Sequence, residues 1–278
     1  MKTQDTTKDK KIPSETTKPQ QPKTHKQILI EQLCEGMETY EHNKTKVLLG
    51  SFTAGLELGF SYFLIAMVYT LLAGRIPPEY IPYAAAFVYP VGFIMVVMGR
   101  SILFTEQTSL LFLPVLHGKR QLKELAVLWA TVIFGNLLGG IAIALILVWV
   151  GTHIGIIDEE ALKNIALHVI DFSNYTIFAS AVLAGWLMAL LSWLVTSSTD
   201  SISRIFMVYM ITFIVGFAGL HHSIVGNIEV FTGLITSSQI KFLDYLGFQV
   251  TALFGNALGG VFFVALLRYR AFSANLNK

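Results

Sequence analysis

Ionisable side chains interrupt two of the long apolar stretches in this sequence. Arg100 and Glu106 lie in the first of these stretches, and His221, His222 and Glu229 lie in the second. A charged group at the centre of a bilayer costs roughly 2.5–3.5 kcal/mol on insertion scales, so each of these side chains is a candidate for function or for an internal ion pair. For Arg100 and the two glutamates we weigh both interpretations equally, with Arg100 pairing either Glu106 or Glu229.

The chemistry of histidine favours a functional role for His222. An imidazole gains or loses a proton near neutral pH, and a desolvated one does so at low cost when an anion arrives. Half-helices that meet at the membrane midplane also point the positive ends of their dipoles, at their N-termini, toward the midplane. This favours an anion there, or a neutral acid that forms hydrogen bonds. For His221, bracing of the backbone is the alternative interpretation.

The composition is that of an integral membrane protein. Of the 278 residues, 54% are hydrophobic and only 14% are charged, whereas soluble domains carry roughly 25% charged residues. The net charge of +2 argues against a nucleic-acid partner, and the single Cys34 precludes an intrachain disulfide. We find no nucleotide-binding loop, metal-ligand cluster or nucleophile motif, so we expect no cofactor, no metal and no enzymatic activity.

The apolar stretches predict six membrane crossings, since a spanning helix needs roughly 20 apolar residues. The crossings are residues 47–73, 82–116, 125–151, 176–197, 205–236 and 247–267. The second and the fifth are too long for one simple helix. Gly99 begins an interruption in the second crossing and Gly219 begins one in the fifth, so both helices are predicted to be broken.

A repeated motif divides these crossings into two sets of three. Residues 134–140 read FGNLLGG, and residues 254–260 read FGNALGG, 120 positions later. The same spacing carries Gly99 onto Gly219. Because three is odd, the second copy must enter the membrane in the opposite direction, which gives a 3+3 inverted repeat. In such folds the site lies near the membrane midplane, at the discontinuous helices.

The polar residues of the repeated motif have a structural interpretation. A buried amide needs hydrogen-bond partners, and the free backbone groups of a broken helix supply them. We therefore expect Asn136 and Asn256 to brace the two breaks, together with Gly99 and Gly219. The other glycines let helix backbones approach closely.

Basic residues orient the chain, because loops rich in Lys and Arg stay in the cytoplasm. Sixteen Lys and Arg residues fall on the side of the two termini and only three on the other side. The polar N-terminus cannot bury enough apolar area to fold. The predicted segments are a disordered cytoplasmic tail (1–27), an amphipathic surface helix (28–46), the first repeat (47–151), an extracytoplasmic loop (152–175), the second repeat (176–268) and a cytoplasmic tail (269–278).

Four motifs in this order resemble the formate–nitrite transporter family, over residues 30–270. They are Leu103-Phe104-Thr105, the Phe-Gly-Asn-x-x-Gly-Gly motif at 134–140, His222-Ser223-Ile224 and the second Phe-Gly-Asn-x-x-Gly-Gly motif at 254–260. The resemblance implies an aquaporin-like protomer, a homopentamer with one pore in each protomer, and a place in the bacterial inner membrane. It implies that Thr105 faces His222 between two apolar constrictions. It also implies passage of small monovalent anions such as formate, nitrite, hydrosulfide or lactate.

The sequence departs from that family's pattern at several positions. Arg100 replaces a glycine, Ile102 replaces an acidic residue and Glu106 replaces a small residue. Ala184-Gly185-Trp186 stands where the family often has Ala-Asn, and His221 stands where formate channels can carry an acid. The chain is thus similar to a divergent branch of the family.

We therefore expect a channel or transporter for small weak-acid anions or their neutral acids, with proton coupling through a pore histidine. The expected pathway residues are Thr105, His222, Glu106, His221 and Arg100. One alternative is a channel for neutral solutes, against which the charged residues argue. Another is a membrane scaffold that recruits partners through its basic tail, against which the two breaks argue.

Overall fold

The computed structural model describes residues 22–273, and that part of the chain is all-helical. The elements, in chain order, are α1 (His25–Glu41), α2 (Lys44–Leu72), η1 (Pro78–Tyr80), α3 (Ile81–Ala85), α4 (Pro90–Gly99), α5 (Phe104–Leu116), α6 (Leu122–His153), α7 (Glu159–Ile170), α8 (Asn174–Ser197), α9 (Ser201–Phe217), α10 (Ser223–Thr236), α11 (Phe242–Gly260), the π-helix η2 (Val261–Leu266) and α12 (Leu267–Ser273).

Within residues 22–273, four helical segments are long and apolar enough to cross a membrane. They are Lys44–Leu72, Pro78–Gly99, Leu122–His153 and Asn174–Ser197. The apolar helices α9 and α10 are shorter than a full span. The protein is therefore an all-α, multi-pass membrane protein, as the composition predicts.

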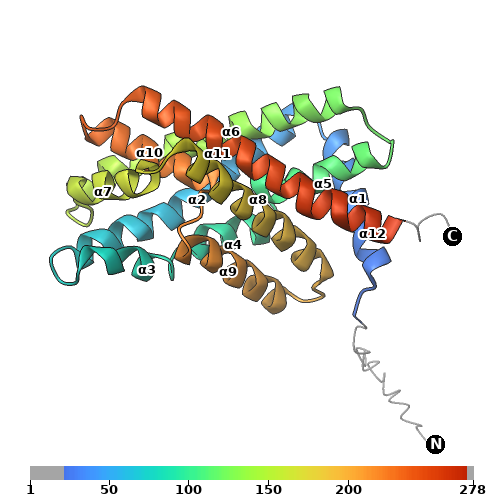
Figure 1. Cartoon of the computed structure of the whole chain (residues 1–278), viewed down its shortest axis with the longest axis horizontal. Helices are drawn as coiled ribbons and strands as arrows, with labels where there is room; N and C mark the ends of the chain where they lie inside the picture. The colour runs from blue at the N-terminus through green and yellow to red at the C-terminus, as the bar shows by residue number, and fades with distance from the viewer. Residues whose placement is uncertain (1–21, 274–278) are drawn as a thin grey trace, which may run out of the picture.

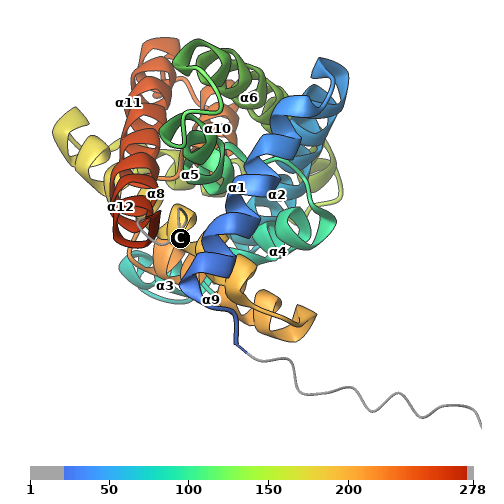
Figure 2. The ribbon, with the colours of Figure 1, turned by 90° about the vertical axis from the view of Figure 1, so that its right-hand side faces the viewer.

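The long helices run side by side along the longest axis of the molecule (Figure 1). The described ends of the chain, α1 and α12, lie at one end of this bundle, and α3 and α7 lie at the other. Viewed along the bundle, the short helices α5 and α10 lie near its centre, with the longer helices around them (Figure 2). The fold thus places the two helices that follow the predicted interruptions in the interior.

Glycines allow the closest helix pairs, α2 with α6 and α8 with α11. A methyl group added to Gly139 would lie 2.1 Å from the Phe52 carbonyl oxygen, and one added to Gly259 would lie 2.0 Å from the Val182 carbonyl oxygen. Any side chain would push these backbones apart. The packing interpretation of the glycine motifs is therefore confirmed at these two positions.

The N-terminal region differs from the prediction in its boundaries. Residues 1–21 of the predicted tail lie outside the described part of the chain. Helix α1 begins at His25 because Thr24 and Gln27 form a capping box, in which each side chain bonds the other residue's backbone N–H. The predicted surface helix ends at Glu41, and Asn43 caps the separate helix α2.

The segment expected to be an extracytoplasmic loop, 152–175, contains helix α7. Its buried residues are Ala161, Leu162, Ile165 and Ala166, which form one apolar stripe at helical spacing that packs on α10. The helical spacing of these apolar residues is hard to see in the sequence, because acidic residues stand at the start of the segment. At the other end of the chain, residues 269–273 of the predicted tail belong to helix α12. Residues 274–278 lie outside the described range.

Candidate substrate pathway

Short non-helical segments occur at both predicted interruptions. Helix α4 ends at Gly99 and α5 begins at Phe104, while α9 ends at Phe217 and α10 begins at Ser223. The turns are made in the left-handed region, by Arg100 (φ +57°) and by Gly219 (φ +61°). A non-glycine residue in this region is uncommon. The backbone groups at the ends of both segments need partners, because Leu103, His221 and His222 are buried.

Asn136 of α6 supplies partners for the first segment. Its side-chain oxygen accepts a hydrogen bond from the Phe104 N–H (2.8 Å). Its amide nitrogen donates to the carbonyl oxygens of Ser51 (2.7 Å) and Ile102 (2.8 Å). One buried amide thus joins α2, α6 and the start of α5.

Asn256 of α11 makes the matching set of bonds at the second segment. Its oxygen accepts from the Ser223 N–H (2.8 Å), and its nitrogen donates to the carbonyl oxygens of Ala181 (2.7 Å) and His221 (3.0 Å). The two asparagines therefore hold the two segments in equivalent ways, which is the arrangement that a bracing role requires.

Thr105 and His222 meet between these two segments. The Thr105 hydroxyl lies 2.6 Å from Nε2 of His222, and both side chains are buried. Nδ1 of His222 accepts a hydrogen bond from the Val225 N–H (3.2 Å), as the N-cap of α10. In the neutral imidazole the proton then sits on Nε2, which donates to Thr105. The helix cap thus orients the ring toward the threonine.

His221 is held differently from its neighbour. Its Nε2 donates to the Val169 carbonyl oxygen (2.9 Å), and its Nδ1 lies 2.8 Å from the Ser180 hydroxyl. Its backbone N–H also donates to that hydroxyl. Since both ring nitrogens are engaged by the protein, the contacts fit the bracing interpretation of His221 better than a free titrating role.

A cavity of about 390 Å³, which we call the vestibule, opens at the end of the bundle that carries α1. Acidic and basic side chains line it together. Its titratable residues are Glu31, Glu35, Glu38, His42, Lys46, Arg100, Glu106 and Arg204. The vestibule is thus charged but roughly balanced in sign, unlike a purely cationic funnel for anions.

Within residues 22–273, neither Arg100 nor Glu106 takes part in an ion pair. The pairing expected between them is therefore not formed. Arg100 is exposed to the vestibule and interacts with Glu35 of α1 instead. Desolvation against the vestibule wall raises the pKa of Glu35, and the Arg100 guanidinium opposes this rise.

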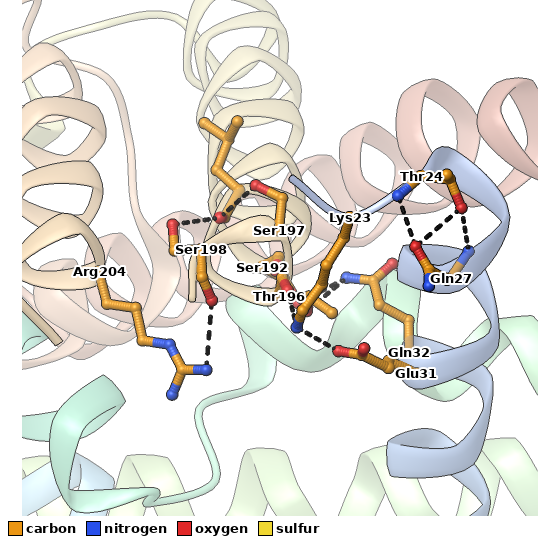
Figure 3. A network of polar contacts seen from close by, with 11 residues as sticks. Lys23, Thr24, Gln27, Glu31, Gln32, Ser192, Thr196, Ser197, Ser198 and Arg204 are labelled. Carbon is orange, nitrogen blue, oxygen red and sulfur yellow. Dashed lines mark hydrogen bonds and ion pairs between the residues drawn. The ribbon is translucent and has the colours of Figure 1, made fainter. Parts of the chain in front are cut away.

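A network of polar contacts lies at the N-terminal end of α1 (Figure 3), a helix that lines the vestibule with its glutamates. The Lys23 ammonium donates to the Thr196 carbonyl oxygen (2.8 Å) and pairs with Glu31 (2.5 Å). The Gln32 amide donates to the Ser192 hydroxyl (3.2 Å). These contacts tie α1 to the end of α8.

A second cavity, of about 70 Å³, lies near α7, and we call it the inner pocket. It is lined by Tyr69, Tyr89, His168, His221, His222 and Glu229 among other residues. From the sequence, Glu229 is a candidate for the pathway or a partner of Arg100; within residues 22–273 it makes no ion pair with Arg100, and it lines this pocket. The tyrosines gave no signal, because their approach to α10 depends on how the helices pack. Partial desolvation at the pocket wall lowers the pKa of His168 of α7, although part of its side chain is exposed.

The vestibule and the inner pocket lie at opposite ends of the bundle. Helix α2 lines the vestibule with Gly50 and the inner pocket with Ile65 and Tyr69. At 1.5 Å per residue, the 15 residues from Gly50 to Ile65 span about 22 Å. The buried contact between Thr105 and His222 lies between the two cavities, since Glu106 lines the first and His222 the second.

The fold and site define a multi-pass, all-helical membrane protein in which two cavities approach one buried polar contact. The family model described as "Formate/nitrite transporter" matches residues 26–270, so the chain belongs to the formate/nitrite transporter family. The resemblance seen in the motifs is thereby confirmed.

Relatives and solved structures agree with this assignment. Inner membrane protein YfdC of Escherichia coli is 28% identical over 84% of this chain and 74% of its own length. Nitrite transporter NirC of Salmonella typhimurium is 25% identical over 78% of this chain and 80% of its own length. The structure described as "FNT family ion channel" has a TM-score of 0.77 at 21% identity, covering 88% of this chain and 98% of that one. A "Pentameric formate channel with formate bound" has a TM-score of 0.70 at 20% identity, covering 83% and 98%.

Proposed function

We propose that this protein is a membrane channel or transporter for small monovalent weak-acid anions of the formate and nitrite kind. The observation that carries the proposal is the buried Thr105–His222 contact between two cavities at opposite ends of the bundle. The family supports it, since relatives include a nitrite transporter and a formate channel. Transport, rather than catalysis, is the activity that those names share.

The fine topology is part of the same proposal. The chain crosses the membrane six times as two inverted repeats of three, with broken second and fifth helices, and both termini lie in the cytoplasm. The matching bonds of Asn136 and Asn256 support the repeat. The excess of Lys and Arg on the side of the termini supports the orientation. This orientation makes the vestibule cytoplasmic and the inner pocket extracytoplasmic.

A homopentamer in a bacterial inner membrane is the proposed assembly. It is supported by the likeness to a pentameric channel and by the relative named as an inner membrane protein. Large apolar side chains are exposed on α6 and α11 of the single chain, where lipid or a neighbouring protomer would cover them. They include Phe134, Leu138, Trp149, Phe254 and Leu258.

The residues take distinct roles along the proposed pathway. Thr105 and His222 form its centre, where the imidazole exchanges hydrogen bonds, and a proton, with the passing solute. Arg100 and Glu106 face the solute in the vestibule, and His221 forms part of the wall of the inner pocket. Proton coupling through His222 follows from the ring's ability to change charge near neutral pH.

An uptake assay on vesicles containing the purified protein tests this function. Formate, nitrite and lactate are supplied singly, and glycerol serves as the neutral solute of similar size. We expect at least one of the anions to enter faster than in protein-free vesicles, and glycerol to enter at the protein-free rate. Glycerol entry with no anion entry would instead establish a neutral-solute channel.

A further inference from the structure

A carboxyl group in the inner pocket has no basic partner. Glu229 lies on α10, seven residues beyond His222, so both point to nearly the same side of the helix. Both line the inner pocket. No hydrogen bond or ion pair of the Glu229 side chain occurs within residues 22–273, and no lysine or arginine of that range lines the pocket.

The groups around Glu229 are phenols and imidazoles. Tyr62, Tyr69 and Tyr89 all interact electrostatically with its carboxyl group. The imidazoles of His168, His221 and His222 line the same pocket. Such a pocket repels a bare anion when Glu229 is ionised, and it offers the anion a proton when Glu229 is protonated.

The vestibule contains a second carboxyl group of this kind. Glu106 directly follows Thr105 in the first turn of α5, and only 9% of its surface is exposed. Its charged neighbour is Glu35 of α1. The basic groups of the vestibule, Arg100, Arg204, Lys46 and His42, make no ion pair with Glu106 in the described part of the chain. The Thr105–His222 contact is thus flanked on each side by a carboxyl group without a counter-charge.

Proton relays across membranes are built from such carboxyl and imidazole groups. A structural carboxylate would instead be neutralised by a nearby cation or several hydrogen bonds, because an isolated charge is costly to bury. We propose that Glu229 and Glu106 are the proton-exchange groups of the inner pocket and of the vestibule, so that the weak acid crosses together with one proton. This inference rests on the proposed function and names the groups that couple it to protons.

The proposed cycle conserves protons and charge. Protonated Glu229 gives its proton to an oxygen of the anion, so the O–H bond of the carboxyl group breaks and that of the neutral acid forms. At Thr105 and His222 the neutral acid exchanges hydrogen bonds with the imidazole, which takes up the proton of the acid and returns it as the solute passes. The carboxylate of Glu106 then takes the proton, and the anion leaves through the vestibule. Glu106 releases the proton to water there, and Glu229 takes a proton from water on its own side.

The test measures the uptake of labelled formate and of nitrite into vesicles whose outside is more acidic than their inside. The proton entry that accompanies each anion is measured at the same time. Glu229→Gln and Glu106→Gln keep the shape of the side chain but cannot carry the proton. We expect each to reduce gradient-driven uptake at least about tenfold, a conservative figure beside the roughly 10²–10⁴-fold contribution of a positioned proton donor. Glu229→Asp and Glu106→Asp should restore part of it.

Glu57→Gln is the matched control, because Glu57 is also a glutamate within a spanning helix but lines neither cavity. It should retain the uptake and proton entry of the unmodified protein. Gln variants with unchanged gradient-driven uptake would overturn the inference. Equal losses of uptake in the Gln and the Asp variants, with the assembly still intact, would also overturn it, because altered packing would then explain the losses. If the unmodified protein carries no anion of the panel, the proposed function itself fails.

Discussion

At the residue scale, the hydrogen bond between Thr105 and His222 is the contact on which transport is expected to depend. Thr105→Val keeps the shape of the side chain but removes the hydroxyl that the imidazole contacts at 2.6 Å. A hydrogen bond is worth about 0.5–1.5 kcal/mol, and about 1.4 kcal/mol corresponds to tenfold in rate. We therefore expect anion uptake to fall by up to about tenfold. Thr105→Ser retains the hydroxyl and should transport nearly as well; equal rates for the Val and Ser variants would show that the contact is not used.

Single residues show where sequence reasoning succeeded and where it stopped. The meeting of Thr105 with His222 follows from family motifs that lie more than a hundred residues apart, so periodicity alone does not reveal it. Arg100 and Glu106 line the same vestibule but form no ion pair within residues 22–273, and Arg100 interacts with Glu35 of α1 instead. Charge and spacing within one broken helix did not reveal this partner, because it comes from a separate helix that packs against the vestibule.

At the scale of elements, close helix packing predicts a graded response to added methyl groups. Gly139→Ala and Gly259→Ala each place a methyl group about 2 Å from a backbone carbonyl oxygen. At Gly247 of α11, by contrast, an added methyl group meets nothing within 4 Å. Overpacking costs typically about 1–3 kcal/mol, whereas replacing a helical glycine in open space gains about 0.5–1 kcal/mol. Thermal unfolding midpoints in detergent should fall for the first two variants and not for Gly247→Ala. A common fall in all three would contradict the packing account.

The two asparagine braces predict matched losses of stability. Asn136→Leu and Asn256→Leu each leave one N–H and two carbonyl groups without their buried partner. An orphaned buried group costs about 1–3 kcal/mol, so both variants should unfold at clearly lower temperature and by similar amounts. The exposed Asn164 of α7 is the control, because Asn164→Leu at the surface should change stability by less than about 0.5 kcal/mol. A stable Asn256→Leu beside an unstable Asn136→Leu would argue against equivalent repeats.

Most of the elements were predictable because apolar runs and paired glycine motifs mark membrane helices strongly. Helix α7 was not, since its four buried residues form a stripe too short to stand out beside its acidic start. The inner pocket was also not predictable. It combines α2, α7 and α10, and only the packed bundle brings their side chains together.

At the scale of the whole molecule, the single cysteine offers a direct test of orientation. Cys34 is exposed on α1, at the end of the bundle proposed to face the cytoplasm. A membrane-impermeant maleimide should label it in inside-out vesicles and not in right-side-out vesicles. In a Cys34→Ser background, Glu159→Cys at the start of α7 should give the reverse result. Labelling of both positions from the same side would contradict the proposed topology.

The most direct test of the central claim, that small weak acids cross this protein past Thr105 and His222, is a pH profile of uptake. Formate and nitrite uptake by the unmodified protein and by His222→Asn are measured side by side from about pH 5 to pH 8, the range in which an imidazole changes charge. We predict that uptake by the unmodified protein varies with pH, and that His222→Asn loses most of the rate or its pH dependence while its unfolding temperature changes little. Normal uptake by His222→Asn across the whole range would contradict the account and leave His222 as only a structural cap of α10.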